Sequence, residues 1–178
     1  ARAEGIDVTA DQYPYIAGST SVSALLPPWA HEGGRDQMVV RLQDQETRAR
    51  IEQDMKSRLP GWDNDFRAVP WDRVLLSSCA DKSFEGRPIA DIAAALAKDP
   101  YQTVFDILAE TDPGTGMIVF MMLEEEVKLM MTHDLVMVGT DASGIRPAGP
   151  TGKGKPHPRA YGTFPRVLGK YVREEKAL

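Results

Sequence analysis

Asp141 is the residue whose type and position most favour chemistry. Residues 136–142 read Val-Met-Val-Gly-Thr-Asp-Ala, so its carboxylate follows a short apolar run that is typical of a buried strand. Ligands bind at the carboxyl ends of strands in barrels and in open parallel sheets. A carboxylate at that place can bind a metal ion or accept a proton from metal-bound water. The alternative interpretation is an aspartate that caps the following turn.

Two further groups of polar and aromatic residues are candidates for binding a substrate. His157 and Arg159 are separated by one proline, and an arginine binds a carboxylate through two parallel hydrogen bonds. Tyr13 and Tyr15 follow the first expected strand, where their hydroxyl groups are suited to contacting a substrate oxygen. The alternatives are a surface turn for the His-Pro-Arg sequence and core or interface packing for the tyrosines.

The sequence contains no complete set of metal ligands. His31 and His133 are isolated, no histidines have His-x-His or His-x-x-x-His spacing, and Cys79 is the single cysteine. A zinc site needs three or four such ligands, so the chain is not expected to bind zinc alone. Asp141 is the only metal ligand that the pattern suggests, and Cys79 is expected to be a packed core thiol.

The composition is typical of a soluble globular domain. The chain has 178 residues, of which 42% are hydrophobic and 26% are charged, and its net charge is −5. The negative charge argues against a nucleic-acid or anionic-membrane surface, because both need clustered positive charge. No apolar run approaches the roughly 20 residues of a membrane span. The single cysteine is consistent with a reducing cytoplasm.

The expected elements form an α/β arrangement. Strands are expected at 6–12, 74–76, 116–122 and 135–139. Helices are expected at 35–58 with a new start near Asp44, from Pro88, from Asp99 to a break at Pro113 and Gly114, at 123–132 and at 164–178. Loops are expected at 18–23, 60–70 and 142–159, and residues 25–29 are expected to be extended.

The elements around Asp141 are expected to form a βαβ unit. Strand 116–122, helix 123–132 and strand 135–139 follow one another, which predicts parallel pairing of the two strands. The Gly- and Pro-rich loop 142–159 is longer than most loops of compact domains, and such loops are usually functional. Four apolar residues of the last helix are expected to face inward: Val167, Leu168, Tyr171 and Val172.

Three stretches resemble the N-acyl-D-amino-acid deacylases (D-aminoacylases) of the amidohydrolase superfamily. They are residues 11–20 (Asp-Gln-Tyr-Pro-Tyr-Ile-Ala-Gly-Ser-Thr), 139–141 (Gly-Thr-Asp) and 157–169 (His-Pro-Arg-Ala-Tyr-Gly-Thr-Phe-Pro-Arg-Val-Leu-Gly). Residues 25–30, 71–72 and 85–86 are also similar to the family. The resemblance covers nearly the whole chain but only part of the family's length.

The resemblance implies a fold of which this chain is one part. The family has a (β/α)₈ barrel, a small β-sandwich domain and a small α+β insertion after the seventh barrel strand. Residues 1–18 resemble the strand-seven segment, residues 19–115 the inserted domain, and residues 116–178 the strand-eight segment with the substrate loop and C-terminal helix. The chain is therefore expected to be a C-terminal-half fragment that lacks most of the barrel.

The resemblance also implies a reaction, the hydrolysis of an N-acyl-D-amino acid to a carboxylate and a D-amino acid. In the family, zinc is held by His and Cys residues on earlier strands, and the carboxylate that matches Asp141 takes a proton from zinc-bound water and delivers it to the leaving nitrogen. None of those ligand motifs is in this chain. Zinc is therefore expected in the full-length enzyme but not in this chain, which is expected to be inactive alone.

Further residues match substrate-binding positions of the family. Tyr13 matches a tyrosine at the substrate, Arg159 an arginine suited to the α-carboxylate, and Met122 a methionine of the side-chain pocket, while His157 belongs to the same substrate loop as Arg159. Two positions depart from the family. Val119 replaces a pocket tyrosine of some members, and Thr-Asp-Ala at 140–142 replaces the more usual Ser-Asp-Gly.

Two other functions remain open at this point. One is a related amidohydrolase that acts on cyclic amides, of the dihydroorotase or hydantoinase type. The other is a non-catalytic binding module. A small-molecule N-acyl-D-amino acid is the expected partner, and exposed strand edges give a possible route to a homo-oligomer.

Overall fold

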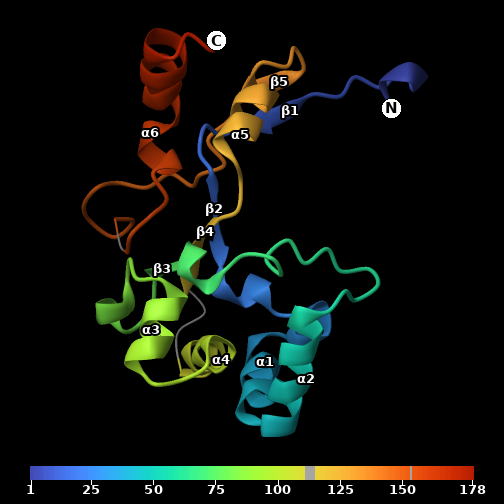
Figure 1. Ribbon diagram of the computed structural model, residues 1–178, viewed down its shortest axis with the longest axis vertical. Coiled ribbons are helices and arrows are strands. Elements are labelled where there is room, and N and C mark those ends of the chain that lie inside the picture. Colours follow the sequence, from blue (N-terminus) through green and yellow to red (C-terminus); the bar gives the residue numbers. More distant parts are fainter. Residues whose placement is uncertain (111–114, 153) are drawn as a thin grey trace. The chain divides into compact units, whose positions relative to one another are not determined.

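The computed structural model describes residues 1–110, 115–152 and 154–178, which form two compact units (Figure 1). The smaller unit contains Ala1–Gly18 and Met122–Leu178, and the larger unit contains Ser19–Met121. The break expected at Pro113 and Gly114 lies outside the described residues. Among the helices within the described ranges, none has both the length and the apolar character needed to cross a membrane.

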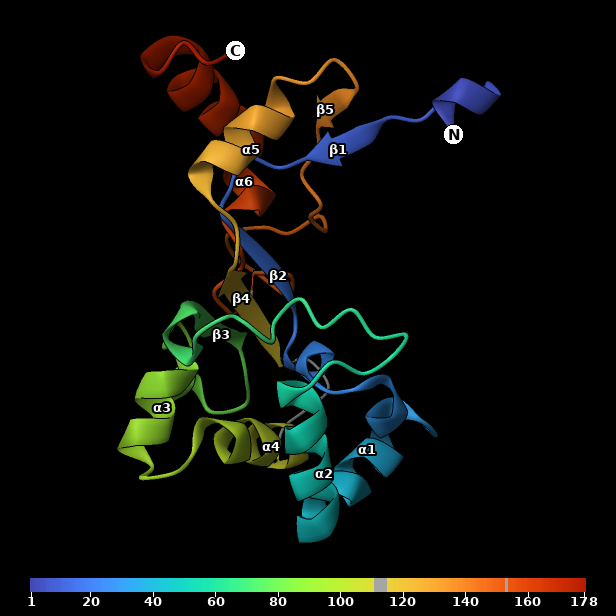
Figure 2. The ribbon, with the colours of Figure 1, turned by 45° about the vertical axis from the view of Figure 1, so that its right-hand side comes forward.

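A pair of short parallel strands organises the smaller unit. Strand β1 (Ala10–Gln12) pairs with β5 (Val136–Val138) in parallel, and Asp11 lies opposite Met137. Helix α5 (Glu124–Met131) packs beside both strands, as the two views show (Figures 1 and 2). The chain begins with a short 3₁₀-helix, η1 (Arg2–Glu4), which ends at Gly5 with φ of 81°.

The βαβ prediction is wrong in its strand pairing. Strand β4 (Gly116–Phe120) does not pair with β5 but lies antiparallel to β3 (Val74–Ser78) in the larger unit. An apolar run identifies a strand but not its partner, because the pairing is set by tertiary packing. The expectation that β5 is a buried strand is also wrong, since Met137 is exposed.

The C-terminal helix begins earlier than expected. Helix α6 (Arg159–Arg166) continues directly into a π-helix, η6 (Val167–Glu174). Val167 and Tyr171 are buried as expected, but Leu168 and Val172 are exposed. The apolar cluster that receives this helix is small: Val127, Met131 and Tyr171, with Ile16 and Met122 packed against them. Such a narrow contact buries only one row of side chains.

The first helices of the larger unit agree with the sequence. Two 3₁₀-helices, η2 (Val22–Leu25) and η3 (Pro28–His31), precede α1 (Arg35–Gln43) and α2 (Gln45–Lys56). Asp44 starts α2, where its carboxylate accepts hydrogen bonds from the Thr47 backbone N–H at 2.8 Å and hydroxyl at 2.6 Å. The extended conformation expected for residues 25–29 holds only for Leu26 and Pro27.

The larger unit contains a three-stranded sheet of order β2-β4-β3, in which β3 and β4 were expected as strands but β2 was expected as a loop. Strand β2 (Ala17–Ser21) covers the Gly-Ser-Thr-Ser stretch, and its pairing with β4 overrides the weak strand propensity of those residues. The register between β3 and β4 shifts between Leu76 and Ser78. Gly116 is needed opposite this shift, since a Cβ there would lie 2.6 Å from the Ser77 hydroxyl oxygen.

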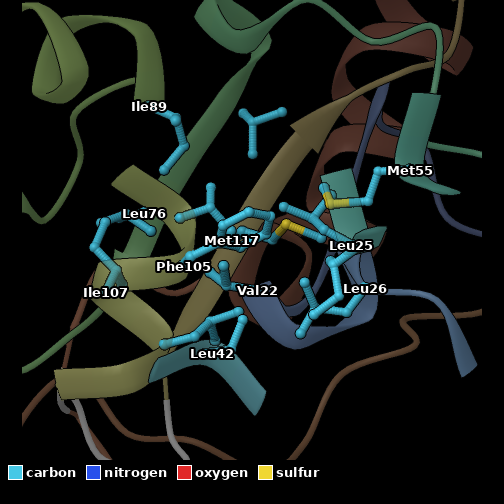
Figure 3. Close-up of a cluster of buried hydrophobic side chains, with 14 of the residues drawn as sticks. Val22, Leu25, Leu26, Leu42, Met55, Leu76, Ile89, Phe105, Ile107 and Met117 are labelled. Atoms are coloured by element: carbon cyan, nitrogen blue, oxygen red, sulfur yellow. The ribbon is translucent and has the colours of Figure 1, made fainter. Parts of the chain in front are cut away.

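The core of the larger unit lies between the sheet and its helices (Figure 3). Helices α3 (Ile89–Ala95) and α4 (Pro100–Glu110) pack on one another, and two short 3₁₀-helices, η4 (Trp71–Arg73) and η5 (Lys82–Phe84), flank β3. The residues labelled in the close-up are Val22, Leu25, Leu26, Leu42, Met55, Leu76, Ile89, Phe105, Ile107 and Met117. Cys79 is a buried free thiol, as expected.

Candidate functional site

Asp141 lies three residues after β5 and pairs with Arg159. Its carboxylate Oδ2 is 2.8 Å from Nη1 of Arg159, and the Asp141 side chain is 71% exposed whereas that of Arg159 is 10% exposed. The backbone of Asp141 has φ of 44°, in the left-handed region that Asp adopts more readily than most residues. The carboxylate of Asp141 is thus bound by a buried cation and remains exposed to solvent.

The buried guanidinium of Arg159 also stacks on an aromatic ring. Its Cζ lies 4.8 Å from the ring centroid of Tyr13, a distance at which a cation is attracted to the ring face. Arg159 is the first residue of α6, and Tyr13 follows β1 directly. The structure therefore brings together three of the sequence-predicted site residues from distant parts of the chain.

The buried side chain of His157 is 4% exposed and uses both of its ring nitrogens within the chain. Nδ1 accepts a hydrogen bond from the Arg159 backbone N–H at 3.0 Å, so Nε2 carries the proton and donates to the Ala17 carbonyl at 2.8 Å. The ring makes edge contacts with Tyr13 and Tyr15, at centroid distances of 6.0 and 5.2 Å. A neutral imidazole bound in this way has no nitrogen left for a substrate or a metal.

Burial lowers the pKa of His157, and the nearby Arg159 adds to this effect, while the bond to Ala17 and the charge of Asp141 oppose it. The neutral ring is therefore favoured by folding. We expect the free energy of unfolding to fall as the pH drops from the ordinary histidine pKa of about 6.5 through the lower folded-state pKa, because the unfolded ring binds its proton first. Urea unfolding at a series of pH values measures this dependence.

A pair of variants isolates the contribution of His157 to that pH dependence. His157→Gln removes the titrating ring and is expected to flatten the fall below about pH 6.5. His31→Gln, at an exposed position of the larger unit, is expected to retain the wild-type fall. Equal pH profiles for His157→Gln and the wild type would contradict a neutral, buried His157.

Met122 lies in a different cluster from Asp141. Its side chain is half-buried against Val127, Met131 and Tyr171, and its backbone N–H donates to the Ile16 carbonyl at 3.1 Å. Val119, the other position connected with side-chain preference, is buried in the core of the larger unit. Of the sequence-predicted residues, Asp141, Arg159, His157 and Tyr13 form one group, and Met122 is outside it.

Arg166 was not predicted from the sequence as a site residue, and Tyr15 was predicted only as a contact to substrate. Arg166 donates from Nε to the Pro14 carbonyl at 2.6 Å, and its Cζ lies 5.0 Å from the ring centroid of Tyr15. The hydroxyl of Tyr15 donates to the Pro158 carbonyl at 3.4 Å, and burial raises the pKa of that hydroxyl. The spacing of Arg159 and Arg166 could have indicated that Arg166 belongs to the site, because it places both side chains on the same face of one helix.

An acidic centre links the start of α5 to η6. Glu124 accepts hydrogen bonds from the Tyr171 hydroxyl at 2.6 Å and from the Lys170 ammonium, and Arg166 Nη2 lies 3.8 Å away. Burial opposes the charge of Glu124, but the bonds from Lys170 and Tyr171 outweigh it and hold the pKa of this carboxyl below its usual value. This network anchors Arg166 behind Tyr15.

The donor set of the described residues does not fit a zinc ion. No group of three or more His, Cys, Asp or Glu side chains converges anywhere in 1–110, 115–152 or 154–178. Asp141 is bound to Arg159, and both nitrogens of His157 are used.

Comparisons with known proteins identify relatives of this chain. No protein-family model matches it. The chain is 29% identical over 169 residues to a D-aminoacylase of Alcaligenes xylosoxydans xylosoxydans, covering 94% of this chain and 24% of that protein. It is 31% identical over 178 residues to an N-acyl-D-glutamate deacylase of the same organism, covering 100% of this chain and 26% of that protein.

Solved structures agree with these relatives. The crystal structure of N-acyl-D-glutamate deacylase from Bordetella bronchiseptica, complexed with zinc and a phosphonate inhibitor, matches 99% of this chain and 26% of that one, with a TM-score of 0.61 and 27% identity. A crystal structure of D-aminoacylase matches the same shares with a TM-score of 0.59 and 28% identity. The mixed α/β fold of this chain therefore matches a part of D-aminoacylase.

The chain spans about a quarter of the length of the curated relatives that it matches. The resemblance read from residues 11–20, 139–141 and 157–169 is confirmed by these matches, which extend over nearly the whole chain. The chain is a homologue of the D-aminoacylases and N-acyl-D-glutamate deacylases and corresponds to one part of those enzymes.

Proposed function

We propose that this chain is part of a zinc-dependent amidohydrolase that hydrolyses N-acyl-D-amino acids to a carboxylate and a free D-amino acid. The observation that carries the proposal is the Asp141 carboxylate, exposed just past β5 and paired with an arginine buried under Tyr13. Homology to deacylases, one of them solved with zinc and a mimic of the tetrahedral intermediate, supports the reaction type. The zinc ligands are assigned to residues outside this chain.

Asp141 is suited to moving the proton that amide hydrolysis requires. Attack of water on the acyl carbon releases a proton, and cleavage of the C–N bond leaves an amine that needs one. An exposed carboxylate at the reaction centre accepts the first proton and donates it to the leaving nitrogen. The proton is thereby conserved, and Asp141 returns to its ionised form for the next substrate.

Arg159 is assigned to the α-carboxylate of the substrate. A guanidinium has five N–H donors, so it can bind Asp141 and a second carboxylate at the same time. Its stacking on Tyr13 and its burial fix its position before substrate arrives. Tyr13 is assigned to the same substrate, and Met122 to its side-chain pocket.

The parallel pairing of β1 and β5 supports the proposal that these two strands belong to a larger sheet. Parallel strands in proteins are normally covered on both faces and belong to sheets of several strands. Here the pair has two strands, and Met137 is exposed. We assign β1 and β5 to neighbouring strands of a (β/α)₈ barrel, residues 19–115 to a domain inserted between them, and residues 116–178 to the segment of the last strand.

The experiment is a substrate comparison with the complete enzyme that contains this chain, loaded with zinc. We expect release of D-amino acids from N-acetyl-D-amino acids, no release from the L-enantiomers, and no activity of the 178-residue chain alone. Turnover of hydantoins or dihydroorotate without release of D-amino acids would instead favour a cyclic amidohydrolase. Deacylation by the isolated chain would contradict the assignment of the zinc ligands to residues outside it.

A further inference from the structure

His157 connects two segments that are far apart in the sequence. Its Nε2–H donates to the Ala17 carbonyl at the start of β2, and its Nδ1 accepts from the Arg159 N–H at the start of α6. Arg159 opens its helix, so its backbone N–H has no partner within the helix, and Pro158 supplies no side-chain cap. The His157 imidazole therefore caps the N-terminus of α6 at Arg159, the residue that pairs with Asp141.

Aromatic and basic side chains keep the His157 ring in place. Tyr15 meets the ring edge at an interplanar angle of 89° and donates its hydroxyl to the Pro158 carbonyl. Gly162 leaves the space that this hydroxyl occupies, because a Cβ there would lie 2.5 Å from the Tyr15 oxygen. Arg166 covers Tyr15 and is tied in turn to Glu124. The orientation of the imidazole is thus set by contacts that do not involve Asp141.

We propose that His157 is a positioning residue, which fixes Arg159 through its backbone and thereby aims the guanidinium at Asp141 and at the substrate carboxylate, without itself touching the substrate. The proposal rests on the proposed function, because it assigns a role within that reaction. It replaces the interpretation of His157 as a direct substrate ligand. Its basis is that the ring is 4% exposed and that both nitrogens have partners.

Two substitutions separate the two hydrogen bonds of the ring. In His157→Asn, the amide oxygen stands near the place of Nδ1 and keeps an acceptor for the Arg159 N–H. In His157→Gln, the amide nitrogen reaches toward Ala17 as Nε2 does, but the acceptor for Arg159 is lost. We expect His157→Gln to raise KM for an N-acyl-D-amino acid about tenfold in the complete enzyme, the effect of one lost hydrogen bond. The expected increase for His157→Asn is smaller.

A second substrate distinguishes positioning from general structural damage. In the corresponding N-acyl-D-amino acid α-amide, the carboxylate that Arg159 would bind is absent. We expect the difference in KM between His157→Gln and His157→Asn to disappear with this amide. A defect of equal size with both substrates would overturn the proposal, and His31→Gln serves as the control for replacing an exposed histidine.

The bonds of His157 can also be tested apart from activity. Nitrogen-15 NMR of the complete protein is expected to show a neutral His157 with its proton on Nε2, both before and after addition of the D-amino-acid product. A shift of the Nε2 signal to that of a nitrogen bound to product would identify His157 as a direct ligand and overturn the proposal. Absence of deacylase activity in the wild type refutes the proposed function, whereas this tautomer measurement tests the His157 bonds in either case.

Discussion

Asp141→Asn in the complete enzyme is expected to lower kcat by a factor of about 10² to 10⁴, the range that positioned proton transfer contributes. The amide keeps the shape of the carboxylate and an oxygen for the Arg159 contact, but it neither accepts the proton of the attacking water nor delivers one to the leaving nitrogen. The measurement is steady-state release of D-amino acid, together with the zinc content of the same preparation. Zinc content is expected to be unchanged.

Asp134→Asn provides the matched control for that substitution. Asp134 is an exposed aspartate just before β5, and the same chemical change there is expected to leave kcat near the wild-type value. Unimpaired turnover of Asp141→Asn would refute the assignment of Asp141 to proton transfer. Loss of zinc with loss of activity would instead assign Asp141 to metal binding.

Phe105→Ala is expected to lower the free energy of unfolding of the larger unit by about 3–5 kcal/mol. Phe105, which is labelled in Figure 3, belongs to α4 and is 0% exposed. Arg48 Cζ lies 5.8 Å from the centroid of its ring. Removing the ring leaves a cavity among residues that already have close partners, so the surroundings close it only in part. Denaturant unfolding followed by tryptophan fluorescence reports on this unit alone, because Trp29, Trp62 and Trp71 all lie within it.

Val40→Ala in α1 is the control from the same unit. Val40 is 56% exposed, so its truncation is expected to change the free energy of unfolding by no more than about 0.5 kcal/mol. Equal unfolding midpoints for Phe105→Ala and the wild type would contradict the packing around α4.

Local signals predicted the helices of this chain better than its strands. The start of α2 at Asp44 follows from a carboxylate three residues before an N–H that it can cap, which is information within one turn. Strand β2 was predicted as a loop and β4 was paired with the wrong strand. Both depend on partners far away in the sequence, and local propensity does not contain those partners.

The candidate site shows the same division between residue type and arrangement. The residue types predicted Asp141, Arg159, His157 and Tyr13 as site residues, and these four residues contact one another in the structure. Their mutual roles were not accessible from the sequence, because the burial of Arg159 and the engagement of both His157 nitrogens follow from tertiary contacts with Tyr13 and Ala17. Tyr15 was predicted only as a substrate contact, whereas its contacts to Pro158 and His157 follow from the fold.

The neighbouring positions of β2 and β4 have a consequence for how the chain folds. The Val22 N–H donates to the Thr115 carbonyl, and the Met122 N–H donates to the Ile16 carbonyl, so the larger unit is entered and left through adjacent strands. Once the core of the larger unit has formed, the two ends of the segment that connects β1 to β5 are held close together. The entropy cost of closing that loop is then already met, and we expect the parallel pair to form late, after the larger unit.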